Sequence, residues 1–179
     1  MQTDTAFEPL VTERLLLRRS VPDDADVISA YRSDPDVRRW QGWDRTDPDG
    51  VRAMIEEMSS RSPGEAGGWV QLSVIERETG VLVGDVGMSP ADGEPGVMKI
   101  GYTIAPATQG RGYATEAVGA LVDYILGTLG ADVVRAYASA SNAPSIAVAE
   151  HVGMKLVERI RRGQHGDDVR YVVRYERRR

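Results

Sequence analysis

The order of apolar and polar positions along the chain predicts an alternation of short strands and amphipathic helices. Short runs rich in valine, isoleucine and leucine, bounded by turn residues, are typical of strands. A hairpin turn is expected at residues 77–80, Arg-Glu-Thr-Gly, which separate two of these runs. The predicted strands lie at residues 14–18, 69–76, 81–88, 97–104, 133–140, 155–161 and 169–176.

Four other stretches carry the signals of helices. Pro22 followed by two aspartates, and Asp47 followed by proline, are typical of helix starts. Gly130 and Gly153 are typical of positions just beyond a helix end. Asp34 and the proline that follows it are expected to end the first helix. The predicted helices cover residues 22–32, 48–58, 112–129 and 144–151.

The order of these elements indicates the fold class. The second half of the chain alternates strand pairs and single strands with helices, after a start that reads as an antiparallel meander. This order predicts a mixed α/β fold of the α+β kind, with a twisted, mostly antiparallel sheet flanked by helices. The chain has 179 residues and no internal repeat, so we expect one domain over residues 1–179.

The amino-acid composition excludes several kinds of site and partner, mainly because certain residue types are absent or rare. The chain has no cysteine, which excludes disulfides, thiol nucleophiles and cysteine-based metal sites. Only two histidines are present, so we expect no metal. A net charge of −5 argues against general nucleic-acid binding, which needs a basic face. Without a signal-peptide layout or an apolar run of membrane length, we expect a soluble, cytoplasmic protein with no membrane partner.

One loop carries the clearest chemical signal. Residues 109–115, Gln-Gly-Arg-Gly-Tyr-Ala-Thr, follow a predicted strand and open a predicted helix. Two glycines let the backbone approach a ligand closely, and the first amides of the helix can bind an anion. A kinase-type phosphate loop needs a lysine that is absent here, and the dinucleotide fingerprint needs a third glycine where Thr115 stands. Another kind of phosphate site and a simple tight turn both remain open.

The motifs around this loop resemble those of a known family. In order, the chain holds Ile100-Gly-Tyr-Thr-Ile104, Pro106, Gln109-Gly-Arg-Gly-Tyr-Ala114, Thr115-Glu-Ala117, Asn142-Ala-Pro-Ser145 and Gly153-Met154. Together they resemble the acetyl-CoA-binding core of the GCN5-related N-acetyltransferase (GNAT) superfamily, and most of all the branch that acetylates ribosomal-protein N-termini together with its many small-molecule relatives. Residues 12–18 are similar to the first strand of that branch, so the resemblance covers nearly the whole chain.

The resemblance implies a fold and a donor. Central strands splay apart in this superfamily, and an acyl-CoA, ordinarily acetyl-CoA, passes its acyl group directly to an amine. The strand that ends at Ile104 is implied to pair with pantetheine through its backbone and to offer an amide to the oxyanion. Asn142 is implied to contact pantetheine, and Ser145 to lie near the sulfur as an acid; both also suit helix capping. The pyrophosphate is implied to lie on Gln109, Gly110, Arg111, Gly112, Tyr113, Ala114 and Thr115.

The general base is left open. The branch often has a glutamate where this chain has Lys99, and an ammonium group cannot accept the proton. Asp85 on the preceding strand is a catalytic candidate, with a solvated carboxylate as the alternative. Glu116 is expected to be a structural hydrogen-bond acceptor. An acceptor amine of low pKa would need no base at all.

The acceptor is expected to bind in the region between residues 34 and 68. Trp40 and Trp43 lie there in a connection and form either an acceptor wall or a small core under the loop. Tyr102 either lines the acceptor side or packs in the core. Acetylation of a primary amine on a small molecule is the function expected first. Alternatives are a protein N-terminus or lysine as acceptor, succinyl-CoA as donor and a CoA sensor without activity. The chain is expected as a monomer or a homodimer.

Overall fold

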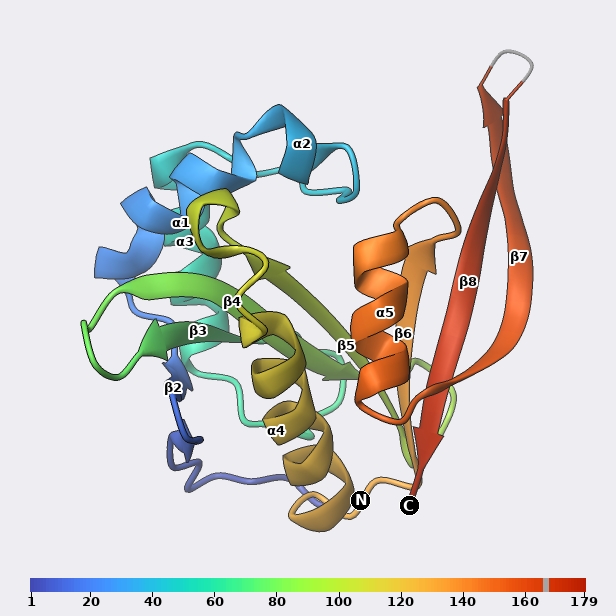
Figure 1. Ribbon diagram of the computed structural model, residues 1–179. Coiled ribbons are helices and arrows are strands. Elements are labelled where there is room, and N and C mark those ends of the chain that lie inside the picture. Colours follow the sequence, from blue (N-terminus) through green and yellow to red (C-terminus); the bar gives the residue numbers. More distant parts are fainter. Residues whose placement is uncertain (166–167) are drawn as a thin grey trace.

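The computed structural model describes residues 1–165 and 168–179, and its strands form an eight-stranded sheet with helices on both faces (Figure 1). The spatial order is β1-β2-β3-β4-β5-β6-β8-β7. All neighbouring pairs are antiparallel except β5 and β6, which are parallel. The expected mixed, mostly antiparallel fold is thereby confirmed. The strands are β1 (Leu10–Val11), β2 (Leu15–Arg19), β3 (Val70–Glu76), β4 (Leu82–Pro90), β5 (Val97–Ile104), β6 (Val133–Ser139), β7 (Lys155–His165) and β8 (Asp168–Arg178).

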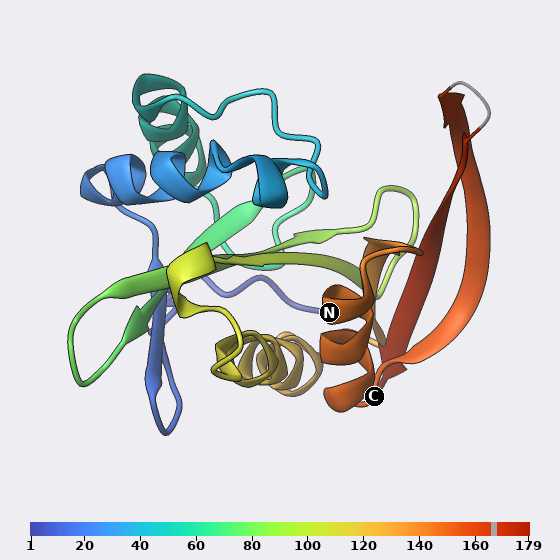
Figure 2. The same ribbon diagram turned by 45° about the horizontal axis from the view of Figure 1, so that its top comes forward.

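Helix α4 covers one face of this sheet and forms the main core with it (Figure 2). Val86 and Met88 of β4 are fully buried in one cluster with Leu121 and Ile125 of the helix. Successive strand residues point to opposite faces, so Asp85 points away from α4. The helical elements are η1 (Pro22–Asp24), α1 (Ala25–Arg32), α2 (Pro35–Arg38), α3 (Pro48–Ser59), η2 (Pro106–Thr108), α4 (Tyr113–Gly127) and α5 (Ala143–His151).

Helices α1 and α3 cover the other face (Figure 2). They pack on each other through a second, smaller cluster that includes Ile28, Tyr31 and Ile55. The predicted start of α3 is confirmed, because the Asp47 side chain accepts the amide of Gly50 at 2.9 Å. None of the helices in the described parts of the chain is long and apolar enough to cross a membrane.

The parallel strands β5 and β6 separate after a short paired stretch. Residues 97–100 pair with residues 133–136, and beyond them the two strands have no common register. The Ala105 amide binds the carbonyl of Val83 at 2.9 Å, which directs the polar groups of alternate β5 residues toward β4. The N–H and C=O groups of Tyr102 and Ile104 therefore point into the widening gap. This gap is the splay that the resemblance implied.

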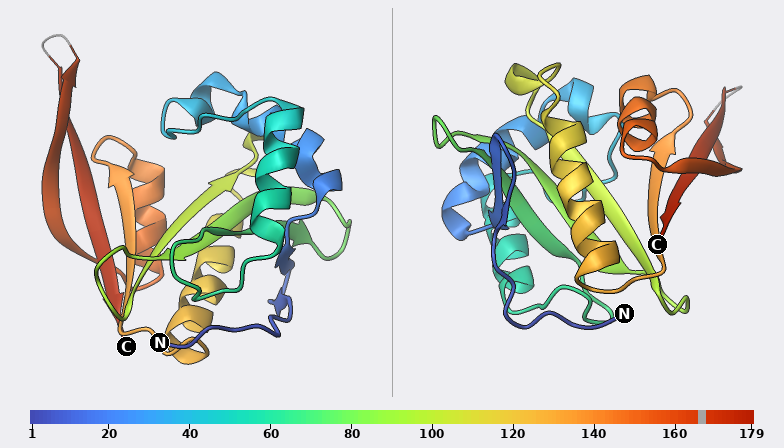
Figure 3. Two further views of the ribbon diagram at one scale, coloured as in Figure 1. Left: turned by 180° about the vertical axis from the view of Figure 1, so that it is seen from behind. Right: turned by 60° about the horizontal axis from the view of Figure 1, so that its bottom comes forward.

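Two elements differ from the sequence-based expectation. Asp34 and the next proline were expected only to end a helix, but the Asp34 carboxylate accepts the amide of Asp36 at 2.8 Å and begins α2. The final hairpin also continues beyond the predicted strands, because its polar residues extend the ladder without an apolar signal. Strands β7 and β8 consequently rise beyond the rest of the molecule (Figures 1 and 3).

Candidate active site

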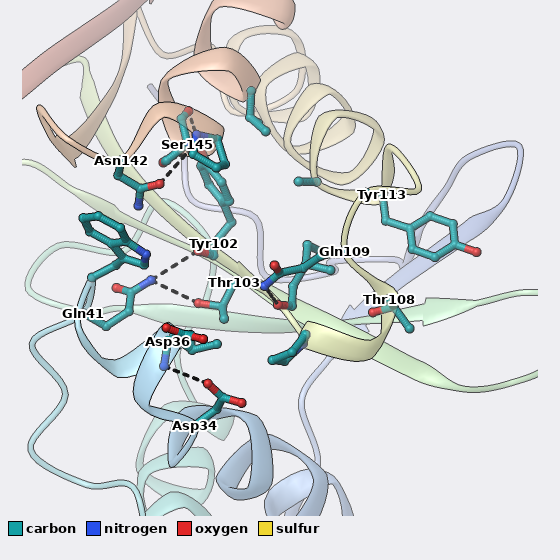
Figure 4. A pocket seen from close by; sticks show the side chains of 18 of the residues that line it. Asp34, Asp36, Gln41, Tyr102, Thr103, Thr108, Gln109, Tyr113, Asn142 and Ser145 are labelled. Atoms are coloured by element: carbon teal, nitrogen blue, oxygen red, sulfur yellow. Dashed lines mark hydrogen bonds between the residues drawn. The ribbon is translucent and has the colours of Figure 1, made fainter.

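A cavity of about 830 Å³ opens at the splayed end of the sheet. Three elements line it: α2 with the connection that follows it, the segment from the end of β5 into α4, and the start of α5. This volume lies within the usual range of ligand sites. The close-up view shows Gln41 and Asn142 on different walls of the cavity, with Tyr102 between them (Figure 4).

The loop at residues 109–115, called the glycine loop below, forms one end of this cavity. Gly110 and Gly112 have φ angles of +76° and +81°, which glycine adopts without strain. Gly112 is the N-cap of α4 and offers no side chain to the first amides of the helix, which leaves these amides free for an anion. All the predicted loop residues except Arg111 line the cavity.

Two side chains of the loop bind the protein itself. The Gln109 amide donates to the Ile104 carbonyl at 2.9 Å and so holds the loop against the end of β5. Tyr113 is buried, and its hydroxyl donates to Glu76. Its ring points away from the cavity in Figure 4. At both positions the backbone, rather than the side chain, is therefore available to a ligand.

The end of β5 presents free backbone donors. The Ile104 carbonyl is occupied by Gln109, and the Tyr102 carbonyl accepts a longer contact, 3.4 Å, from the amide of Gln41. Gln41 also donates to the Thr103 hydroxyl at 3.1 Å. The backbone N–H groups of Tyr102 and Ile104 point into the gap, and neither Gln41 nor Gln109 binds them. A ligand with amide or carbonyl oxygens can add to this strand.

Asn142, Ser145 and Tyr102 meet at the start of α5. The Asn142 oxygen accepts the amide of Ser145 at 3.2 Å, which is the predicted helix cap. The hydroxyl of Tyr102 donates to the Ser145 carbonyl at 2.8 Å and lies 2.8 Å from the Ser145 hydroxyl oxygen. Tyr102 thus reaches across to α5 instead of joining the wall that carries Trp40.

The Tyr102 hydroxyl is held in its protonated form. Burial raises the pKa of this phenol above its ordinary value, and the hydrogen bond with Ser145 offsets only part of that increase. At neutral pH the pair of hydroxyls consequently carries a proton that can be donated. A hydroxyl pair of this kind suits an acid catalyst.

Asp85 does not line the cavity, which argues against its candidate role as general base. The alternative of a solvated carboxylate is wrong, because the residue is only 3% exposed. The carboxylate is buried beneath α1, where it accepts hydrogen bonds from Tyr31 and Gln71 and lies 3.7 Å from Arg32. Burial raises its pKa, and the charge of Arg32 and the two hydrogen bonds act against that increase. Strand alternation indicates which face a residue occupies, but not which helix covers that face.

The two tryptophans have different surroundings. Trp40 lines the cavity, with the guanidinium of Arg39 4.7 Å from the centre of its ring. Trp43 does not line it and instead packs on the buried guanidinium of Arg32 at 4.6 Å. Only Trp40 therefore belongs to the wall expected for the acceptor.

Sequence reasoning missed Gln41, which the fold brings to the splayed strand. No local signal distinguishes this glutamine from other polar residues in a connection, because its partners lie about sixty residues further along the chain. The structural role expected for Glu116 is confirmed by hydrogen bonds from Thr12 and from the Arg14 amide. Lys99 pairs with Asp92 at 3.3 Å and does not line the cavity.

Comparisons with known proteins agree with this geometry. A family model for an acetyltransferase (GNAT) domain matches residues 14–155. An uncharacterised N-acetyltransferase, p20 of Bacillus licheniformis, is 37% identical over 142 residues, which are 78% of either chain. A GNAT-family acetyltransferase from Bacillus anthracis has a TM-score of 0.82 at 24% identity, covering 96% of this chain and 98% of that one. Mycobacterium smegmatis RimJ, in complex with CoA-disulfide, has a TM-score of 0.80 at 20% identity, with coverage of 99% and 90%. By its sequence and its fold alike, this chain belongs to the GNAT family of acetyltransferases.

Proposed function

We propose that this acetyltransferase moves the acetyl group of acetyl-CoA directly to a primary amine of a small molecule. One observation carries the proposal: a single cavity joins the glycine loop, the free amides of β5 and the hydroxyl of Ser145. These are the groups needed to hold a diphosphate, an extended amide arm and a sulfur leaving group, in that order along the cavity.

The conformation of the loop at residues 109–115 suits an acyl-CoA. The amides from Gly110 to Thr115 would hold the pyrophosphate, since both glycines already have positive φ angles and α4 begins uncapped. The amides of Tyr102 and Ile104 would bind the pantetheine arm and the thioester oxygen. Asn142 lies beside this path, although its side-chain oxygen also caps α5.

Ser145 and Tyr102 are the proposed source of the proton for the sulfur leaving group. Bound acetyl-CoA supplies an acyl group that is already activated as a thioester. The Ser145 hydroxyl would donate a proton to the sulfur, and the Tyr102 hydroxyl, 2.8 Å away, would return one to Ser145 and take its own from solvent. The proton lost by the acceptor amine would go to solvent or to one of the two carboxylates that line the cavity, Asp34 and Asp36.

The acceptor side favours a compact amine. The same cavity of about 830 Å³ would hold both the pantetheine arm and the reacting amine, so only a compact group fits inside it beside the arm. Trp40 offers an aromatic surface, and the carboxylates of Asp34 and Asp36 lie on the same wall. The guanidinium of Arg39 already lies over this ring and pairs with Asp36 at 3.5 Å. A cationic amine would therefore use the other face of the ring and the carboxylate of Asp34. A peptide N-terminus is the alternative acceptor, and succinyl-CoA is the alternative donor.

Thiol release from acetyl-CoA, measured against matched panels of small amines and N-terminal peptides, tests this function. We expect turnover with small amines to exceed turnover with peptides, and acetyl-CoA to be used in preference to succinyl-CoA. Faster turnover with peptides than with small amines would make a peptide N-terminus the acceptor instead of a small molecule. Tight CoA binding without turnover on either panel would identify a sensor instead of an enzyme.

Replacing Ser145 with alanine should lower kcat by roughly 100-fold, in line with the loss of an acid catalyst, while CoA affinity stays close to that of the wild type. Tyr102→Phe should give a smaller decrease, because Ser145 still donates to the sulfur. Pre-steady-state thiol release isolates the chemical step. Ser139→Ala is the matched control, since Ser139 is a nearby serine outside the cavity lining. Unchanged chemistry in Ser145→Ala would remove this residue from the mechanism.

Replacing Trp40 with alanine should raise the acceptor KM by roughly 10-fold, as expected for the loss of an aromatic contact, without changing CoA affinity. Trp43→Ala should instead lower thermal stability, because it uncovers the buried guanidinium of Arg32. Steady-state kinetics and thermal unfolding of both variants separate the two roles. An unaltered acceptor KM in Trp40→Ala would show that acceptors bind elsewhere.

A further inference from the structure

The segment that precedes β2 is attached to the glycine loop by a single arginine. The guanidinium of Arg14 donates to the Arg111 carbonyl at 2.9 Å and contacts the Glu116 carboxylate through two nitrogens, each at 2.7 Å. It also lies over the ring of Tyr113, 4.9 Å from its centre. Arg14 therefore contacts the loop backbone, the first residue of α4 and the first acidic residue of that helix.

Glu116 is fixed in the ionised state beside the expected anion site. Its carboxylate accepts the hydroxyl of Thr12 at 2.6 Å and the Arg14 amide at 2.8 Å. Burial opposes ionisation, but these hydrogen bonds and the guanidinium outweigh it and lower the pKa. The residue lies in the first turn of α4, the turn whose amides face the cavity. A full negative charge thus lies within one helical turn of the place where a diphosphate would bind.

This arrangement poses an electrostatic conflict. A carboxylate in the first turn stabilises an empty helix through the helix dipole, but it repels an anion bound to the same amides. The guanidinium of Arg14 cancels that charge at contact distance. Because it also holds the Arg111 carbonyl, it fixes the turn that leads into Gly112.

We propose that Arg14 is a positioning residue for the diphosphate of the acyl-CoA: it neutralises Glu116 and fixes the backbone of the loop. The inference rests on the proposed function, in which this loop holds the diphosphate. A purely structural attachment of β2 to α4 is the competing explanation. The two explanations predict opposite changes in CoA affinity when the charge of Glu116 is removed.

Four variants separate these explanations: Arg14→Ala, Glu116→Gln, the double variant, and Arg52→Ala as control. Arg52 forms ion pairs with Asp26 and Asp49 on the α1–α3 side of the sheet, and its exposure is similar to that of Arg14. Calorimetric titration with CoA at low and high salt gives the Kd of each variant, and thermal unfolding shows that each is folded.

Arg14→Ala should weaken CoA binding by roughly 30-fold, and by less at high salt, since the exposed Glu116 charge is then screened. Removing that charge as well, in the double variant, should restore part of the affinity. Glu116→Gln alone should bind CoA roughly 3-fold more tightly than the wild type, because Arg14 is left without its counter-charge. Arg52→Ala should bind as the wild type does.

The opposite pattern would overturn the inference. Three outcomes would leave only a structural attachment. They are a wild-type Kd for CoA in Arg14→Ala, a Kd of the double variant as high as that of Arg14→Ala, and a Kd of Glu116→Gln above that of the wild type. The Glu116→Gln result decides the matter even where Arg14→Ala does not fold. Absence of CoA binding by the wild-type chain would overturn the proposed function together with this inference, whereas intact wild-type binding with the opposite variant pattern overturns the inference alone.

Discussion

A Gly112→Asp variant is expected to lose CoA binding, with an increase in Kd of at least roughly 100-fold from backbone strain and charge repulsion together. Gly112 has a φ of +81°, a conformation that residues with a side chain rarely adopt. A Cβ atom there would also lie 3.4 Å from the guanidinium of Arg14. The added carboxylate would stand at the N-cap of α4, next to the amides that the diphosphate needs.

Two control variants divide this effect into its causes. Gly112→Asn has nearly the same volume as the aspartate and tolerates positive φ equally well, so the difference between the two variants reports charge alone. Gly67→Asp places the same residue at another glycine of positive φ, +76°, with open space around it and outside the cavity. Titration with CoA provides the measurement. Wild-type affinity in Gly112→Asp would contradict the assignment of this loop to the diphosphate.

Removal of the Asp85 carboxylate is expected to destabilise the fold strongly. The Asp85→Ala variant leaves the guanidinium of Arg32 buried without its counter-charge, and breaking a buried pair in this way costs about 3–5 kcal/mol. Arg32 is only 2% exposed, and its Nε atom already lacks a hydrogen-bond partner among the described residues. Denaturant unfolding, compared at equal m-values, measures the loss.

The same position distinguishes a structural carboxylate from a catalytic base. Asp85→Asn keeps the shape and the hydrogen bond from Tyr31, but it removes the charge and the acceptor for the Gln71 amide. We expect a lower unfolding midpoint with near-normal kcat in the fraction that is folded. A variant with wild-type stability, lost turnover and a changed pH profile would instead return Asp85 to the role of base. Arg32→Met combined with Asp85→Asn should recover part of the stability, since neither charge then remains.

The sequence predicted the parts of the site that depend on local structure. The positive φ angles at Gly110 and Gly112, the uncapped start of α4 and the Asn142 cap all follow from short-range rules about glycine and helix ends. The strands followed from runs of apolar residues, because burial imposes that pattern wherever the strand lies. These features could be predicted without knowledge of their neighbours.

Features that depend on the packing of distant elements were not predictable in the same way. The position of Asp85 on its strand could not show that α1 covers this residue and that Arg32 pairs with it. Tyr102 reaches α5 because β5 and β6 diverge, and this divergence leaves no trace in the composition of either strand. Trp40 and Trp43 lie three positions apart but face different environments. In each case the surroundings of the residue depend on elements that are distant in the sequence.

The divergence of β5 and β6 also bears on which molecules can enter the site. Unpaired amides in the middle of a sheet resemble the edge strands through which proteins aggregate, because any extended chain can add to them. Here the opening is bounded by α5 on one side and by the connection that carries Gln41 on the other. A peptide strand would have to fit a side chain from every residue between these walls, whereas the β-alanine and cysteamine part of a pantetheine arm carries no side chains. The two walls are therefore expected to hinder the addition of a peptide strand to the open part of β5.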